Sequence, residues 1–275
     1  MKQIEMSLSV LGVLAATRLA SATSTSQAAD ENQVTSSVES SKEAKDIRNE
    51  VPNFAYAYTA YGTSPGAVGA QVHSLGLVAP GQEATVGGGG MVWASPFKRL
   101  TFIVDAQRNV SKNFSPSGAV IARLYGSGSQ GLSLSGLGKF KIDGFAAGPK
   151  HDEVESEIEV GFLASVVDSG WLLDLNAIAG RGLGDDGETD AEGRLRLARS
   201  LGSMLRLGVD GQARARLSGP RTLPNGRTWD FAVGPQALLG LDNFYGSFTA
   251  GPTTSGLTSS NVGWVVMAAV GGTTF

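Results

Sequence analysis

The chain has 275 residues, with 22 Lys and Arg against 25 Asp and Glu, for a formal net charge of −3. This near balance, without a strongly basic block, speaks against a nucleic-acid partner. The absence of cysteine excludes disulfides and thiolate metal sites. The 38 glycines need an explanation, because glycine weakens ordinary helices and strands unless turns or close packing require it.

Residues 1–29 are typical of a secretory signal peptide. Lys2 gives a positively charged start, residues 6–16 form an apolar core, and small residues follow up to Ala29. The alternative is an amphipathic soluble helix. The core is too short to span a bilayer as a helix, and no later apolar run reaches the required length of about 18 residues. Residues 30–52 are polar, charged and free of aromatics, which predicts a disordered tail.

From residue 53 onward the composition predicts one domain of alternating strands and Gly-rich turns. The clearest stretch is 204–217, in which Leu205, Leu207 and Val209 share one face while Arg206 and Asp210 share the other. Period-two alternation of this kind indicates a two-faced β-strand. Strands are predicted near residues 66–77, 83–94, 98–107, 117–126, 131–145, 153–167, 171–181, 192–200, 203–217, 227–241, 244–250 and 262–275.

The connections between these strands alternate in length. Counted from the C-terminus, residues 250–261 are long, 242–243 short, 218–227 long and 200–203 short. Single-chain bacterial outer-membrane barrels have an even number of strands, short periplasmic turns and longer extracellular loops. Each alternating stretch also has the roughly ten residues that a tilted strand needs to cross a bilayer.

The last strand, "NVGWVVMAAVGGTTF", ends on Phe275. It resembles the C-terminal signature of outer-membrane β-barrel proteins of Gram-negative bacteria, although Thr273 stands where a second large apolar residue is usual. The resemblance implies an all-β, antiparallel, up-and-down transmembrane β-barrel in the cell outer membrane. It further implies that Phe275 is the signal read by the barrel-assembly machinery, and that outer-membrane lipid and lipopolysaccharide surround the barrel.

In such a barrel the apolar faces meet lipid and the charged faces line the lumen. The predicted lumen charge network consists of Glu155, Glu157, Glu159, Asp174, Arg194, Arg196, Arg206, Asp210, Arg214 and Arg216. Poorly hydrated charges are expected to pair, so we expect the glutamates of 155–159 to bond to Arg194, Arg206 and Arg214. The network either fills the interior or forms a charge-separated constriction that selects small solutes.

Other candidate chemistry is weak. His73 has no carboxylate near it in sequence, and the "HD" at His151 alone scarcely supports a hydrolase. The acidic loop 184–193 is interpreted as solvated, with weak Ca²⁺ or Mg²⁺ binding as the alternative, because it lacks the Gly and Glu positions of an EF-hand. The glycine run 86–93 has no phosphate-loop continuation. We therefore predict no enzymatic activity, no cofactor and no metal site.

Three functions remain in view. The first is a non-enzymatic outer-membrane barrel that acts as a small channel or as a structural or adhesion scaffold, with a charge-paired lumen. The second is a soluble periplasmic ligand-binding barrel, which would have the same faces inverted and which alternation alone cannot separate from the first. The third is an outer-membrane hydrolase that uses His151. Residues 54–62, "FAYAYTAYG", predict either an extra strand or a periplasmic segment that docks on the barrel.

Overall fold

The computed structural model describes residues 56–60, 63–108, 114–126, 130–143, 155–184, 187–219, 228–255, 257 and 262–274. The chain divides into two units, Met1–Glu43 and Ala44–Phe275. The predicted signal peptide and polar tail lie outside the described residues. No helical segment in the described ranges has the length and hydropathy needed to span a bilayer.

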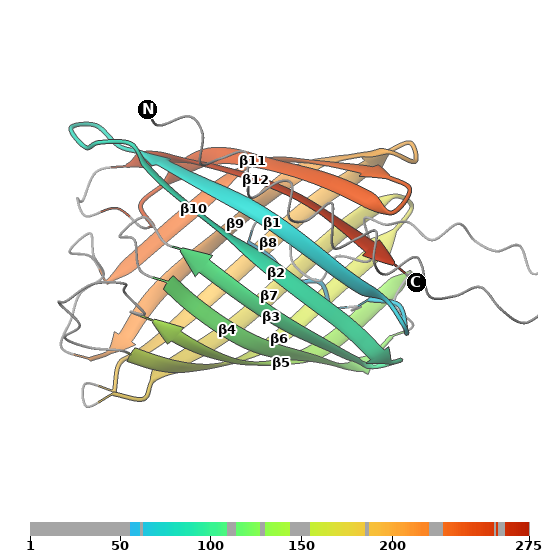
Figure 1. The fold of residues 1–275 in the computed structure, drawn as a ribbon, viewed down its shortest axis with the longest axis horizontal. Helices are drawn as coiled ribbons and strands as arrows, with labels where there is room; N and C mark the ends of the chain where they lie inside the picture. Colours follow the sequence, from blue (N-terminus) through green and yellow to red (C-terminus); the bar gives the residue numbers. More distant parts are fainter. Residues whose placement is uncertain are drawn as a thin grey trace, which may run out of the picture. The chain divides into compact units, whose positions relative to one another are not determined.

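Twelve antiparallel strands close into a barrel in which each strand pairs with its sequence neighbours and β1 pairs with β12 (Figure 1). The strands are β1 Val68–Val78, β2 Thr85–Phe97, β3 Leu100–Arg108, β4 Phe114–Tyr125, β5 Gly131–Asp143, β6 Glu155–Asp168, β7 Trp171–Gly182, β8 Thr189–Leu201, β9 Leu205–Ser218, β10 Trp229–Leu241, β11 Phe244–Thr253 and β12 Gly263–Thr274. The predicted all-β fold and the twelve predicted strands are confirmed. Residues 56–60 do not form a further strand of the barrel wall.

Four strand ends differ from the prediction by three residues, because β2 and β11 end later and β4 and β8 begin earlier. The extensions of β2 and β11 each run past a proline. Residues 95–97, which fall between the predicted strands 83–94 and 98–107, continue β2, with a register shift against β3 between Ala94 and Phe97. Pro96 lies inside this shift, and a bulge is a place where a strand tolerates a residue that cannot donate a backbone hydrogen bond. Residues 251–253 likewise extend β11 past Pro252, which lies opposite Trp264 of β12.

At one end of the barrel, which we call the short-turn end, the connections have two to five residues, and at the other, the long-loop end, they have five to eleven. The turn between β6 and β7 has only two residues, Ser169 and Gly170, both with positive φ (48° and 81°). Such a turn matches the twist of the strands that it joins. The connection from β5 to β6, in contrast, takes residues 144–154. The barrel thus has the loop asymmetry that the sequence predicted.

The two faces of each strand differ sharply in polarity. Leu207 and Val209 are 42% and 48% exposed on the exterior, whereas Arg206 and Asp210 on the interior are 5% and 0% exposed. Closure pairs every strand on both sides, so no strand edge is left open. A barrel with an apolar exterior and charged residues inside suits lipid rather than water, which disfavours the soluble alternative.

This assignment of faces predicts that Leu207→Arg harms folding far more than Gln212→Arg. Leu207 lies on the lipid-facing side of β9, two residues after the strand begins, and a lipid-facing arginine costs up to about 2–4 kcal/mol at the middle of a bilayer and less toward its interfaces. Gln212 lines the interior cavity, where a further charge meets polar side chains and water. The measurement is the yield of heat-modifiable barrel after refolding into lipid vesicles, and equal yields would reverse the faces.

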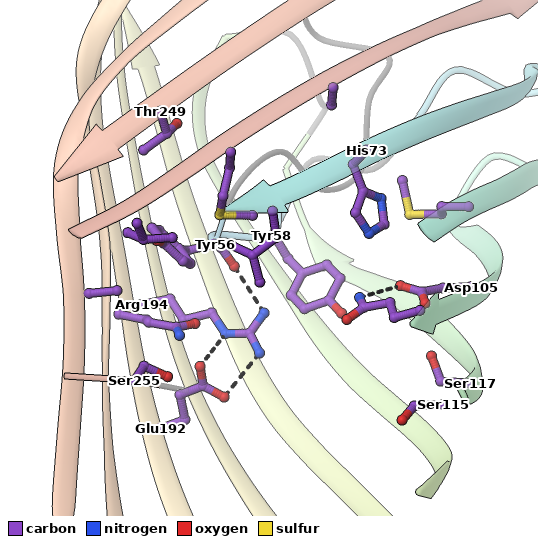
Figure 2. A pocket seen from close by; sticks show the side chains of 18 of the residues that line it. Tyr56, Tyr58, His73, Asp105, Ser115, Ser117, Glu192, Arg194, Thr249 and Ser255 are labelled. Atoms are coloured by element: carbon purple, nitrogen blue, oxygen red, sulfur yellow. Dashed lines mark hydrogen bonds and ion pairs between the residues drawn. The ribbon is translucent and has the colours of Figure 1, made fainter. Parts of the chain in front are cut away.

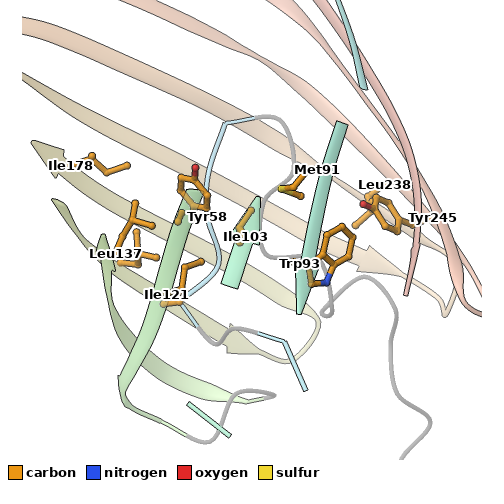
Figure 3. Packing of buried hydrophobic residues seen from close by; sticks show 12 residues of the cluster. Tyr58, Met91, Trp93, Ile103, Ile121, Leu137, Ile178, Leu238 and Tyr245 are labelled. Atoms are coloured by element: carbon orange, nitrogen blue, oxygen red, sulfur yellow. The ribbon is translucent and has the colours of Figure 1, made fainter. Parts of the chain in front are cut away.

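Much of the interior is apolar. A cluster of buried side chains fills the lumen toward the short-turn end (Figure 3). Its members are Tyr58, Ala60, Met91, Trp93, Ile103, Ala119, Ile121, Leu137, Leu163, Ile178, Leu238 and Tyr245. The charged and hydroxyl-bearing residues of the lumen therefore share the interior with a packed core, and water-filled space is confined to part of it.

Candidate functional site in the barrel lumen

The charged residues that the sequence assigned to the lumen lie on the inner face of β6 to β9, wherever the structure describes their side chains. The side chain of Glu155 and the whole of Phe275 lie outside the described residues. Ion pairs among the described residues are Lys139–Glu159, Lys141–Glu157, Arg194–Glu192, Arg196–Asp174, Arg214–Asp190 and Arg216–Glu188. Five of these pairs join residues on the same strand or on adjacent strands. In the sixth, Arg216 of β9 bonds to Glu188, which directly precedes β8.

The partners differ from the predicted ones. Glu159 contacts Lys139 at 3.2 Å and Glu157 contacts Lys141 at 3.8 Å, so both glutamates pair with lysines of β5 instead of arginines of β8 and β9. The reason is the register, which places each lysine directly opposite its glutamate. Arginines on β8 stand two strand spacings away from β6, about 10 Å, and they find acidic partners nearer by.

Those nearer partners come from the stretch that the sequence analysis interpreted as a solvated acidic loop. Asp190 and Glu192 lie within β8, and they pair with Arg214 and Arg194 respectively. Asp186 lies outside the described residues. Within the described ranges, no group of three acidic or histidine side chains is arranged to hold a metal ion.

One pair is fully buried. Asp174 and Arg196 are 0% and 1% exposed, and their side chains meet at 2.6 Å (Oδ2 to Nη2) and 2.7 Å (Oδ2 to Nε). Ser165 donates a hydrogen bond from Oγ to the other carboxylate oxygen of Asp174.

Two further charged residues of the predicted network are bonded to neutral side chains. Asp210, also 0% exposed, accepts a hydrogen bond from the Gln236 amide at 3.3 Å. Arg206 donates to Ser200 Oγ at 3.3 Å.

Residues 56–60, which we call the lumen strap, lie inside the barrel. The backbone N–H groups of Tyr56, Tyr58 and Ala60 donate to Asp210 (3.2 Å), Asn176 (2.7 Å) and Ser165 (2.7 Å). The backbone carbonyls of the same three residues accept from Arg194 (2.9 Å), Asn176 (3.0 Å) and Ser135. Side chains from β5 to β9 thus satisfy alternate residues of the strap as a neighbouring strand would.

The strap is held further by its side chains and by the residues that follow it. The Arg194 guanidinium lies over the Tyr58 ring, 5.0 Å from its centroid. Toward β1, Thr63 forms a hydroxyl cluster with Ser95 and Thr101, whose own oxygens are 2.8 Å apart. Ala57 and Thr59 are 0% exposed, so the strap runs through packed surroundings.

The sequence left open an extra strand or a periplasmic segment docked on the barrel, and the structure instead places residues 56–60 inside the lumen, bonded to side chains of the wall. The alternation of tyrosine with alanine or threonine was the available signal. This alternation fits an extended segment, but it does not reveal that side chains of the barrel wall form the hydrogen bonds to the backbone of the strap. Asn176, Ser135 and Ser165, which make four of these six bonds, were not among the predicted site residues.

Beyond the strap, toward the long-loop end, the lumen opens into a cavity of about 340 Å³ (Figure 2). Its charged lining is balanced, with five basic and five acidic residues: Arg108, Lys139, Lys141, Arg194, Arg214, Asp105, Glu157, Glu159, Asp190 and Glu192. Hydroxyl groups of Ser115, Ser117 and Thr249 line other parts of it. Its size lies within the range of small-molecule sites, about 300–1,000 Å³.

His73 lines this cavity on the inner face of β1. Its ring nitrogen Nδ1 is buried and has no hydrogen-bond partner among the described residues. The ring lies against Gly89 of β2, where a Cβ atom would come within 2.8 Å of Nε2, which is one reason for a glycine in the run 87–90. Asp105 also lines the cavity and is held by the Gln107 amide at 2.9 Å. His151, the residue of the hydrolase alternative, lies outside the described residues.

No protein-family model and no curated protein matches this chain. Among solved structures, it is similar to the KdgM porin in complex with disordered oligogalacturonate, with a TM-score of 0.51, 6% identity and coverage of 74% of this chain and 99% of the porin. It is also similar to an outer membrane channel from Pseudomonas putida F1, with a TM-score of 0.51, 12% identity and coverage of 82% and 100%. At these identities the likeness concerns the fold, and this chain has the fold of outer-membrane β-barrel proteins.

Proposed function

We propose that this chain is a non-enzymatic channel of the outer membrane for small polar solutes, closed in the described conformation by the lumen strap. The observation that carries the proposal is the set of hydrogen bonds between the strap and the wall. Barrel side chains saturate both backbone groups of Tyr56, Tyr58 and Ala60. A segment fastened by separate side-chain bonds, and not by a strand ladder, can leave without breaking the barrel.

In this proposal the long-loop end faces the cell exterior and the cavity is the solute's entrance. Its five basic and five acidic residues cancel, so the cavity repels neither anions nor cations strongly. It favours neutral or zwitterionic solutes with several hydrogen-bonding groups, which the paired charges and the hydroxyls of Ser115 and Ser117 can accommodate. The charge-paired lumen is thus part of the selectivity as well as of the packing.

The test is single-channel conductance in a planar lipid bilayer. Refolded wild type is expected to be closed for most of the recording, and a variant that begins at residue 63 is expected to conduct steadily. Asn176→Leu, which removes both bonds to Tyr58, should give frequent openings. Gln212→Ala is the matched control, because its amide lines the same cavity but makes none of the strap bonds described above.

A closed structural or adhesion scaffold is the second candidate, and the apolar cluster of the lumen favours it. Trp93, Ile121 and Leu163 are at most 2% exposed and remain in the barrel after the strap is removed. If the strap-free variant folds, judged by heat-modifiable migration, and still does not conduct, the channel proposal is wrong and the scaffold stands. A wild type that conducts steadily would agree with a channel but would contradict closure by the strap.

A further inference from the structure

The exterior of the barrel has a hollow on β7, β8 and β9 near the long-loop end. This open depression has a volume of about 790 Å³, and the side chains that point outward from its floor are all small. Two rows of the sheet form this floor, because Ala177, Gly193 and Ala213 stand opposite one another, as do Ala179, Ala191 and Ala215. We call this feature the exterior depression.

Large side chains form its walls. Val160 and Phe162 of β6 stand on one side, 57% and 49% exposed, and Trp229 of β10 stands on the other, 48% exposed. The ring of Trp229 is stacked on Phe231, with the centroids 6.0 Å apart. From β6 to β10 is four strand spacings, about 19 Å along the sheet. Alanine and glycine are depleted in strands, so six of them on three adjacent strands form an unusual stretch of wall.

A second copy of the chain fits this surface poorly. In a two-fold dimer the same patch meets itself, so the raised rings of Phe162 and Trp229 would touch first. Two facing hollows would then enclose an empty space whose walls lose their dispersion contacts. Flexible hydrocarbon chains, in contrast, can follow the floor and fill the hollow. The exterior is apolar, so hydrocarbon is also the material that surrounds it.

A basic residue stands on β7 just beyond the residues that line the exterior depression. Arg181 follows Ala179 on the outward face of β7, one residue before the strand ends, and it is exposed. It lies opposite Thr189 of β8, the first residue of that strand. A guanidinium recognises phosphate with two parallel hydrogen bonds, and strand ends mark the boundary between hydrocarbon and headgroups. The apolar hollow and the cation are therefore arranged as one amphiphilic surface.

We propose that the exterior depression binds acyl chains of a phosphate-bearing lipid of the outer leaflet, with Arg181 bound to the lipid phosphate. The proposal uses the membrane orientation of the proposed function but not the channel activity. A failure of the lipid-binding test therefore says nothing about conductance, and a failure of the conductance test says nothing about lipid binding. Trp229, the first residue of β10, lies opposite Ala215 of β9 and forms the side wall of the hollow.

The test measures binding of lipid A, which carries both phosphates and several acyl chains, to the refolded full chain in detergent by native mass spectrometry. Gly193→Leu fills the floor, and a side chain fits there because nothing lies within 4 Å of the added Cβ. It is expected to weaken binding at least tenfold. Gly138→Leu is the matched control, since Gly138 is an exposed glycine of β5 with equally open surroundings. It should bind lipid A as the wild type does.

The charge is tested at the same time. Arg181→Gln should weaken binding by about tenfold, the loss expected for a charge-assisted hydrogen bond, and Arg181→Lys should recover part of it. Heat-modifiable migration verifies that each variant is folded. Equal lipid A binding by wild type, Gly193→Leu and Arg181→Gln would overturn the proposal. A dimer that Gly193→Leu dissociates, with lipid A binding unchanged, would overturn it too and would assign the depression to a second copy.

Discussion

Asp174→Ala is expected to lower the free energy of unfolding by about 3–5 kcal/mol. Asp174 and Arg196 are almost completely buried, so the guanidinium left behind would lose its hydrogen-bonded carboxylate and have little water, with Asp210 opposite it on β9 as an acidic neighbour. Removing one partner of a buried pair is more damaging than removing both, because the remaining charge is uncompensated. The measurement is urea unfolding of the refolded barrel in lipid vesicles, followed by tryptophan fluorescence.

The same substitution reaches the lumen strap. Ser165 donates to Asp174 and accepts the hydrogen bond from the Ala60 N–H, so Asp174 fixes the direction in which the serine oxygen points. Asp174→Ala should therefore also raise the open probability of the channel. A structural role alone would change stability and leave gating as it is.

Two controls make the result specific. The double variant Asp174→Leu with Arg196→Leu removes both charges, so it should regain much of the stability while the strap stays loosened. Glu157→Ala breaks the longer, partly exposed contact to Lys141 and should cost about 1 kcal/mol or less. Were Asp174→Ala as stable as the wild type, water or Asp210, which stands opposite on β9, would have to stabilise Arg196 in place of Asp174, and the 2.6 Å pair would not be a main source of stability.

The barrel was predictable because lipid imposes a simple rule on the sequence. An outward residue must be apolar and its neighbours may be polar, so the stretch 204–217 displays its two faces without any knowledge of its partners. The alternation of short and long connections predicted the up-and-down topology, because successive connections of such a barrel lie on opposite sides of the membrane. What local sequence could not give was where strands continue past Pro96 and Pro252, because a proline ends a ladder bond in some contexts and sits in a bulge in others.

The partners inside the lumen depend on register, and register is a property of two strands together. Lys139 and Lys141 were visible on a polar face of their strand, but only the pairing of β5 with β6 puts them opposite Glu159 and Glu157. The position of the strap was harder to predict, because its alternating sequence also fits a strand of the wall. Its partners are side chains scattered over β5 to β9, such as Asn176, whose roles appear only when those strands surround one axis.

Trp93→Ala is expected to lower the free energy of unfolding by about 3–5 kcal/mol, the usual effect of truncating a large buried aromatic residue. Trp93 is 2% exposed and belongs to the apolar cluster of the lumen. Its ring lies over Gly69, the residue directly opposite it on β1, where a Cβ atom would overlap the ring. This close approach is what requires a glycine at position 69, and it accounts for one of the many glycines of the chain.

A double-mutant cycle turns this geometry into a measurement. Gly69→Ala alone should lower the free energy of unfolding by about 1–3 kcal/mol, because the rigid ring must move out of a packed interior. Gly136→Ala, at a glycine of β5 with nothing within 4 Å of the added Cβ, should have little effect. In the Trp93→Ala background the ring is gone, so Gly69→Ala should lose most of its cost and the two changes should be far from additive. If instead their costs simply add, the ring does not rest on Gly69, and the packing of the short-turn half of the lumen differs from that described.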